Sequence, residues 1–159
     1  WFPIRLRRWA SCSAVPDQGS PSANAEMPLL PDSTFLIDLR QEFQTGRPGP
    51  LVRLHRRHAL ASYRISVVAV AEFLRGDPAR DAILFVQQNF GRLEPVTREV
   101  ALRWAELQRT RDRTGKPLGA NDAWLAATAL VGGHTILTRD KDYGGVPGLR
   151  VIRYARPHA

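Results

Sequence analysis

Short apolar segments alternate with longer helix-forming segments through most of this chain, and that alternation limits the folds it can adopt. Strands separated by helices favour a parallel sheet. We therefore predict an α/β fold with a central parallel sheet of about four to five short strands, flanked by helices. The expected strands are 28–31, 63–65, 93–96, 135–138 and 149–152, and the expected helices are 35–43, 51–61, 67–74, 79–89, 98–110 and 122–130.

The first strand has two readings. In one, 28–31 is the strand and a helix follows it, which puts Asp32 at the strand end. In the other, 34–37 is the strand, and Asp38 then stands at its end. The periodicity of so few residues does not separate the two readings.

The charge of the chain points to a polyanionic partner. The chain holds 23 Lys and Arg against 15 Asp and Glu, a formal net charge of +8, and its pI is about 10.9. Nucleic acid is favoured over a membrane surface, because the basic residues are dispersed and not gathered on one amphipathic helix. No apolar run approaches the ~20 residues of a membrane span, so we expect no membrane association.

The length and the cysteine content of the chain indicate its domain organisation and its cellular compartment. The 159 residues suit a single domain with a sizeable core. Cys12 is the only cysteine, and no Cys/His cluster has zinc spacing, so we expect a reducing cytoplasm. Residues 1–26 are rich in Ser, Pro and Ala and precede Met27, the only methionine. We expect 1–26 to be a disordered N-terminal extension outside the fold, and 27–156 to be the domain.

Acidic side chains recur where expected strands end or expected helices begin. Taken singly, each has an ordinary explanation: a helix cap, a turn or an exposed helix face. Taken together in a basic chain, they predict a divalent-metal site that acts on a phosphate backbone, as in a metal-dependent nuclease. The candidates are Asp32 or Asp38, then Glu72, Asp122, Asp140 and Asp142.

Four segments follow one another along the chain: LLPDSTFLIDL, SVVAVAEFLRG, GANDAWLAATAL and ILTRDKDY, the last followed by GLRVI. In this order, and spanning about 28–153, the chain resembles the PIN-domain nucleases, and most closely the VapC-like toxins of bacterial toxin–antitoxin modules. The resemblance implies a PIN-like parallel sheet flanked by helices, with an acidic pocket that holds Mg²⁺ or Mn²⁺. It also implies cleavage of RNA, an antitoxin protein that blocks the site, and frequent homodimers.

The resemblance assigns a role to each acid. Such toxins open with a short apolar strand, an Asp, two small polar residues and an apolar helix, a pattern that Asp32 fits and Asp38 does not. We therefore expect Asp38 to be an exposed residue of the following helix, and its replacement by Asn to be tolerated. The resemblance makes Asp32, Glu72, Asp122 and Asp140 the catalytic acids, with Asp32 and Asp122 as metal ligands and Ser33, Thr34, Thr138 and Asp142 in support.

Basic residues are expected on the substrate side. Arg56 and Arg57 in one expected helix, and Arg139 beside the acids, are the candidate RNA contacts, which would add affinity with little sequence information. The alternative function is a catalytically impaired PIN-like module that binds RNA or a partner. Carboxylates at all four positions argue against that alternative, because binding alone does not require them to cluster.

Overall fold

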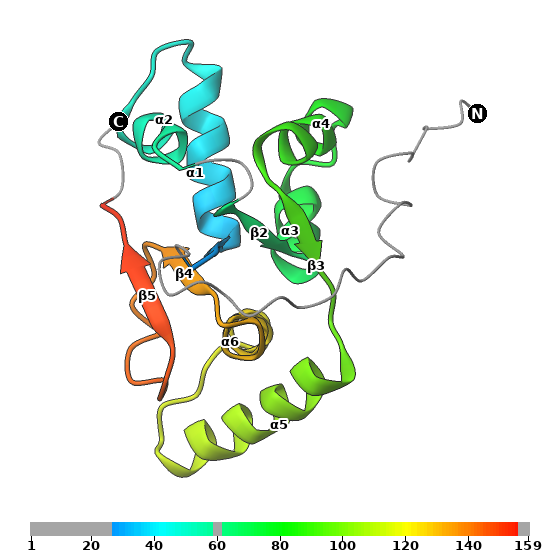
Figure 1. Cartoon of the computed structure of the whole chain (residues 1–159), viewed down its shortest axis with the longest axis vertical. Coiled ribbons are helices and arrows are strands. Elements are labelled where there is room, and N and C mark those ends of the chain that lie inside the picture. The colour runs from blue at the N-terminus through cyan, green and yellow to red at the C-terminus, as the bar shows by residue number, and fades with distance from the viewer. Residues whose placement is uncertain (1–26, 59–61, 156–159) are drawn as a thin grey trace, which may run out of the picture.

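The computed structural model describes residues 27–58 and 62–155. Within these ranges no helix is long and apolar enough to span a membrane. The described chain folds into short strands and helices that alternate along the sequence (Figure 1). The strands are β1 (Leu29–Pro31), β2 (Arg64–Ser66), β3 (Arg92–Glu94), β4 (Thr135–Thr138) and β5 (Arg150–Arg153), and the helices are α1 (Ser33–Gln44), α2 (Pro50–Arg56), α3 (Val67–Gly76), α4 (Arg80–Asn89), α5 (Arg98–Arg113) and α6 (Ala120–Gly132).

The strands pair in parallel throughout. One sheet has the order β1-β4-β5, and a second sheet pairs β2 with β3. Among the described residues, an isolated parallel bridge between Leu29 of β1 and Tyr63, the residue before β2, joins the two sheets. The predicted α/β fold is confirmed, with one refinement: the five parallel strands form a three-stranded and a two-stranded part.

The start of the described chain agrees with the first of the two alternatives for the first strand. Leu29–Pro31 is the strand, and α1 begins at Ser33 with Asp32 as its N-cap. The side chain of Asp32 accepts a hydrogen bond from the backbone N–H of Phe35, one of the donors that the first helical turn leaves without a partner. Residues 34–37 are helical, so the reading that made them a strand is wrong.

Most element boundaries differ from those expected by one or two residues, and three of the differences are informative. β3 ends at Glu94, directly before Pro95, which has no N–H to donate to a strand ladder. α2 ends at Arg56, short of the expected 61, and residues 59–61 lie outside the described residues. α5 continues to Arg113, past the expected end at 110.

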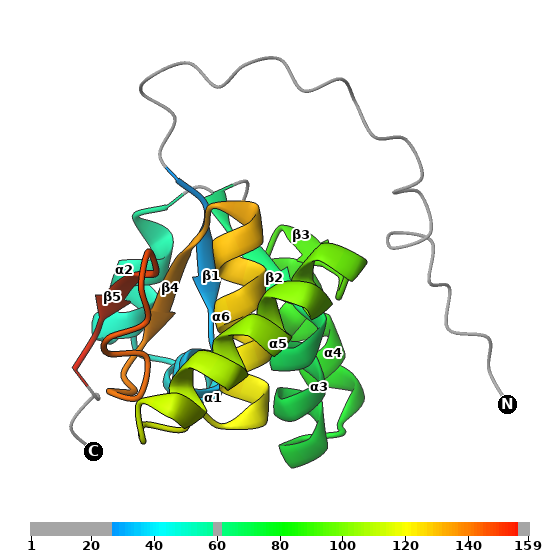
Figure 2. The same cartoon turned by 90° about the horizontal axis from the view of Figure 1, so that it is seen from below.

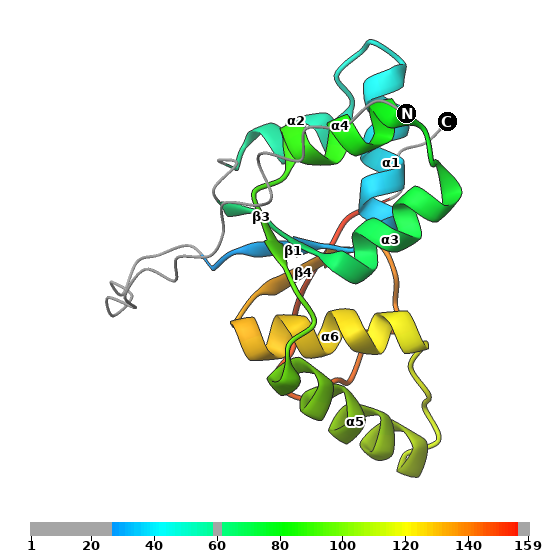
Figure 3. The same ribbon diagram turned by 90° about the vertical axis from the view of Figure 1, so that its right-hand side faces the viewer.

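Helices cover both faces of the strands (Figures 2 and 3). In Figure 3, α1 to α4 lie on one side of the strands, while α5 and α6 lie on the other. β1 and β4 are buried along their whole length, as expected for central strands of a parallel sheet covered on both faces. Because the carboxyl ends of parallel strands meet at one edge, the residues that follow β1 and β4 reach the same edge of the sheet.

Candidate active site

Asp32 lies at the carboxyl end of β1 and is only 4% exposed. Its carboxylate accepts the backbone N–H of Phe35 at 2.8 Å. The hydroxyl of Thr34 lies 2.8 and 2.9 Å from the two carboxylate oxygens, and the hydroxyl of Thr138 donates from the end of β4. Burial raises the pKa of Asp32, and these three sets of hydrogen bonds oppose that rise. Asp32 is therefore a buried carboxyl group surrounded by donors.

Asp122 lies in the first turn of α6, where the helix dipole favours negative charge. The phenolic hydroxyl of Tyr143 donates to its Oδ1 at 2.9 Å. Gly119 leaves room for the carboxylate, because a Cβ at that position would lie 2.7 Å from Oδ2 of Asp122. Burial is the main cause of a raised pKa at Asp122, against which the Tyr143 hydrogen bond acts.

The acids lie close enough together for their charges to raise the pKa of Asp32 and of Asp122. The negative charge of Asp122 raises the pKa of Asp32. The charges of Asp140, Glu72 and Asp142 raise the pKa of Asp122 in turn. Repulsion of this kind acts between carboxylates that share a site, so the fold brings together acids from segments far apart in the sequence.

Glu72 reaches this group from α3 and is half-buried. The side-chain amide of Asn121 donates to its Oε1 at 2.6 Å. Asn121 immediately precedes Asp122, so the hydrogen bond ties α3 to the start of α6 beside the acids.

Thr138 links the two strand ends that carry acids. Its hydroxyl donates to Asp32 and accepts the backbone N–H of Asp140 at 2.8 Å. The carboxylate of Asp140 accepts the backbone N–H of Asp142 at 2.9 Å, which forms a local turn. Of the supporting residues expected from the sequence, Thr34 and Thr138 contact Asp32, whereas the hydroxyl of Ser33 makes no hydrogen bond to these acids within the described ranges.

Three residues of the site were not assigned a role from the sequence: Tyr143, Asn121 and Arg111. Tyr143 and Asn121 donate to acids, as described above. Arg111 is buried in the last turn of α5 and donates to the carbonyl oxygens of Gly144 at 3.2 Å and Asp142 at 3.3 Å. Tyr143 and Asn121 each adjoin a predicted acid in the sequence, which was an available signal. Arg111 lies 31 residues before Asp142, and no local pattern indicates that contact.

Asp38 lies within α1, as expected, but the expectation that it is exposed is wrong. It is 4% exposed, because α1 turns this residue toward the C-terminal segment and not toward solvent. Its Oδ2 accepts a hydrogen bond from the hydroxyl of Tyr154 at 2.9 Å and forms an ion pair with Arg139, whose Nε lies 3.1 Å away. The sequence periodicity of α1 did not indicate this burial, since both partners follow Asp38 by about a hundred residues or more.

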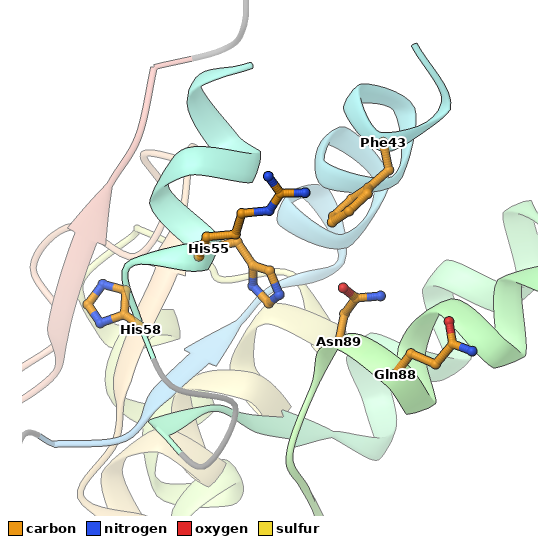
Figure 4. A pocket seen from close by; sticks show the side chains of 6 residues that line it. Phe43, His55, His58, Gln88 and Asn89 are labelled. Atoms are coloured by element: carbon orange, nitrogen blue, oxygen red, sulfur yellow. The ribbon is translucent and has the colours of Figure 1, made fainter. Parts of the chain in front are cut away.

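The candidate RNA-binding arginines fall into two places. Arg139 lies between Thr138 and Asp140, at the acidic site. Arg56 instead lines a separate pocket of about 350 Å³ at the other end of α1, and Arg57 follows it in the sequence. Figure 4 shows that pocket between α1, α2 and α4, and its other lining residues are Phe43, His55, His58, Gln88 and Asn89.

The donor set suits a hard divalent cation. All the acids supply oxygen, and Mg²⁺ takes only one or two direct carboxylates and keeps several of its waters. Among residues 27–58 and 62–155, no three Asp, Glu, His or Cys side chains are gathered closely enough to form a ready-made metal cluster. Asp32 and Asp122, whose charges repel each other, fit a cation held by two carboxylates and water.

The amino-acid sequence matches those of known proteins of one family. The sequence model of the PIN domain matches residues 30–149. Ribonuclease VapC4 of Mycobacterium tuberculosis is 33% identical over 104 residues, which cover 60% of this chain and 80% of that protein.

Solved structures agree in fold. VapBC2 from Rickettsia felis, bound to a DNA fragment from its promoter, superposes with a TM-score of 0.66 at 15% identity, over 81% of this chain and 100% of the matched chain. A toxin–antitoxin complex from Klebsiella pneumoniae gives a TM-score of 0.60 at 23% identity, over 78% and 95% of the two chains. The chain therefore belongs to the PIN-domain family, in which it is similar to VapC-type proteins.

Proposed function

We propose that this chain is a metal-dependent endoribonuclease that hydrolyses RNA phosphodiester bonds and acts as the toxin of a toxin–antitoxin module. The observation that carries the proposal is the meeting of acids from four separate segments, the ends of β1 and β4, the helix α3 and the start of α6, whose negative charges raise the pKa of Asp32 and of Asp122. Repelling carboxylates destabilise a fold unless a cation relieves them, so their presence together supports a metal site. The similarity to a protein named a ribonuclease supports RNA as the substrate.

In this proposal Asp32 and Asp122 hold Mg²⁺, with Mn²⁺ as a possible replacement. The bound cation would lower the pKa of a water molecule and would stabilise the negative charge that develops on the phosphate. Thr34 and Thr138 fix the orientation of the Asp32 carboxylate, and Tyr143 fixes that of Asp122. These donors keep both carboxylates directed at one place.

The remaining acids act on the attacking water. Glu72 or Asp140 orients that water and accepts a proton as its oxygen bonds to phosphorus, while the bond from phosphorus to the leaving oxygen breaks. Each has one carboxylate oxygen already hydrogen-bonded, Glu72 to Asn121 and Asp140 to the backbone of Asp142. These hydrogen bonds hold the two side chains in place and leave the second oxygen of each for water.

The partners follow from the similar proteins. Structures described as VapBC and as a toxin–antitoxin complex share this fold, which supports an antitoxin as the protein partner. We also propose a homodimer and action in the cytoplasm, where the RNA substrate is found. In this proposal Arg139 contacts RNA at the site, whereas Arg56 and Arg57 contact RNA away from the cleaved bond.

A catalytically impaired module that binds RNA without cleaving it is the second candidate. It is disfavoured by the hydrogen bonds that converge on Asp32 and Asp122, because binding alone does not require two oriented carboxylates.

The first prediction separates these candidates. Purified protein should cleave single-stranded RNA with Mg²⁺ or Mn²⁺ and stop when the metal is chelated. Asp122→Asn should lower cleavage at least about 100-fold, the scale of losing one electrostatic contribution to transition-state stabilisation. The matched control is Asp112→Asn, at an exposed position on α5, which should cleave within about twofold of the wild type.

The same variants can be compared in cells. Expression of the wild type should arrest growth, and expression of Asp122→Asn should not. RNA binding without cleavage in both metals would reject the nuclease and favour the binding module.

A further inference from the structure

Asp38 is a buried carboxylate that the proposed reaction does not use. Its Oδ2 has two partners: the hydroxyl of Tyr154, which donates a hydrogen bond at 2.9 Å, and the guanidinium of Arg139, which forms an ion pair through Nε at 3.1 Å. Tyr154 is itself held by an edge contact with Phe35, with ring centroids 5.3 Å apart. A buried carboxylate with charged and neutral donors keeps those donors in place, because losing either would leave a charge poorly compensated.

Arg139 is fixed by only one of its nitrogens. Its Nε pairs with Asp38, and its side chain is 30% exposed. The two terminal nitrogens have no hydrogen-bond partner among the described residues, and they are not among the buried polar atoms that lack one. They therefore reach solvent. A guanidinium is planar, so an anchor at Nε also sets the direction of its terminal N–H groups.

The ion pair of Asp38 and Arg139 lies beside the acidic site, because the hydroxyl of Tyr154 that donates to Asp38 is also 3.4 Å from the hydroxyl of Thr34, which donates to Asp32. The neighbour of Arg139 on one side is Thr138, which donates to Asp32, and on the other side is Asp140. A planar pair of N–H donors matches the oxygens of a phosphate. RNA entering a group of carboxylates also needs a cation to offset repulsion of its backbone.

Resting on the proposed nuclease function, we propose that Arg139 binds a backbone phosphate of the RNA, and that buried Asp38 is the residue that positions it. Lysine could not replace Arg139 in this role. A single ammonium group can pair with Asp38 or with a phosphate, whereas the guanidinium uses Nε for one and its terminal nitrogens for the other.

The second prediction tests the phosphate contact by binding alone. A short fluorescent single-stranded RNA of mixed sequence is titrated with protein in the presence of chelator, because a phosphate contact does not depend on sequence. Arg139→Lys should weaken binding about 10-fold, the order of one charge-assisted hydrogen bond. Arg80→Lys, at an exposed position on α4, is the control and should bind within about twofold of the wild type. Equal affinities for Arg139→Lys and wild type would overturn the contact.

The role of Asp38 is tested by a double-mutant cycle in the cleavage assay. Contrary to the expectation from the sequence that this replacement is tolerated, Asp38→Asn should lower kcat about 10-fold, because Arg139 is present but no longer held. In the Arg139→Lys background the same change should alter kcat by less than about twofold, since no guanidinium is left for Asp38 to position. Thermal melts check that each variant is folded at the assay temperature. A loss of equal size in both backgrounds would mean that Asp38 only stabilises the fold, and would overturn the positioning role.

The two arms also separate this inference from the proposed function. If the wild type fails to cleave with either metal, the nuclease proposal and the positioning role of Asp38 fall together. Binding in chelator still decides the phosphate contact of Arg139 in that case.

Discussion

At the residue scale, Glu42 shows how one acid completes a helix that cannot cap itself. Gly49, the N-cap of α2, has no side chain to offer. The carboxylate of Glu42 reaches from α1 and accepts the backbone N–H groups of Leu51 at 3.2 Å and Val52 at 2.5 Å. A Cβ at position 49 would collide with that carboxylate, so the glycine and the distant cap depend on each other.

The third prediction concerns this cap. Glu42→Ala should lower the free energy of unfolding by about 1–3 kcal/mol, because it leaves buried backbone donors without an acceptor. Glu106→Ala is the matched control: Glu106 is exposed and pairs only with Arg103 on its own helix, so its loss should cost less than about 0.5 kcal/mol. Urea unfolding of both variants measures the difference. An equal decrease in the free energy of unfolding for both variants would show that the Glu42 cap does not stabilise α2.

At the scale of elements, α5 reaches the site through its last turn. Arg111 donates to the carbonyl oxygens of Gly144 and Asp142, and the loop between them contains Tyr143, the donor to Asp122. The end of α5 therefore fixes a loop that in turn fixes an acid on α6.

The fourth prediction follows from this chain of contacts. Arg111→Met should increase hydrogen exchange of the backbone amides in 141–146 and lower RNA cleavage about 10-fold, as the misplacement of a catalytic group does. Arg109→Met, at an exposed position on the same helix, should change neither. Unchanged exchange in Arg111→Met would contradict a role for α5 in holding the loop.

The elements themselves were largely predictable from the sequence, and the contacts between them were not. β4 and α6 have strong local signals, because TILT combines β-branched Thr and Ile with Leu and Gly133 ends the helix with a φ of 66°. The order of the acids along the chain follows from such local signals. The burial of Asp38 depends on Arg139 and Tyr154, and no periodicity reports a contact across that separation.

At the scale of the whole molecule, two buried histidines make the fold sensitive to acid. Burial is the main cause that lowers the pKa of His55 and of His134 to about 4. Neighbouring positive charges add to the effect, from His58 and Arg56 at the first and from Arg64 and Arg150 at the second. His134 lies 3.8 Å from Glu94, but its lowered pKa keeps it neutral at pH 7, so the two do not form an ion pair there.

The fifth prediction is a loss of stability in mild acid. A histidine titrates at 6.5 when unfolded and at about 4 here, so between these values the unfolded chain binds more protons. These histidines therefore destabilise the fold as pH falls through that window, and contribute no change above it. His134→Leu should make the decline in unfolding free energy shallower between about pH 7 and pH 5 in urea titrations. An identical decline in this variant and in the wild type would rule out His134 as a source.

The acids are attached to both of the sheets that meet at the bridge between Leu29 and Tyr63. Asp32 follows β1 and Asp140 follows β4, while Asp122 lies in the first turn of α6, which leads into β4. Glu72 alone is carried by α3, which continues from β2 in the two-stranded part. The acidic site therefore spans the boundary between the three-stranded and the two-stranded sheet. Because α3 also packs against α1 and α6, and Asn121 of α6 donates to Glu72, the place of Glu72 among the acids depends on helix packing across this boundary as well as on the strands.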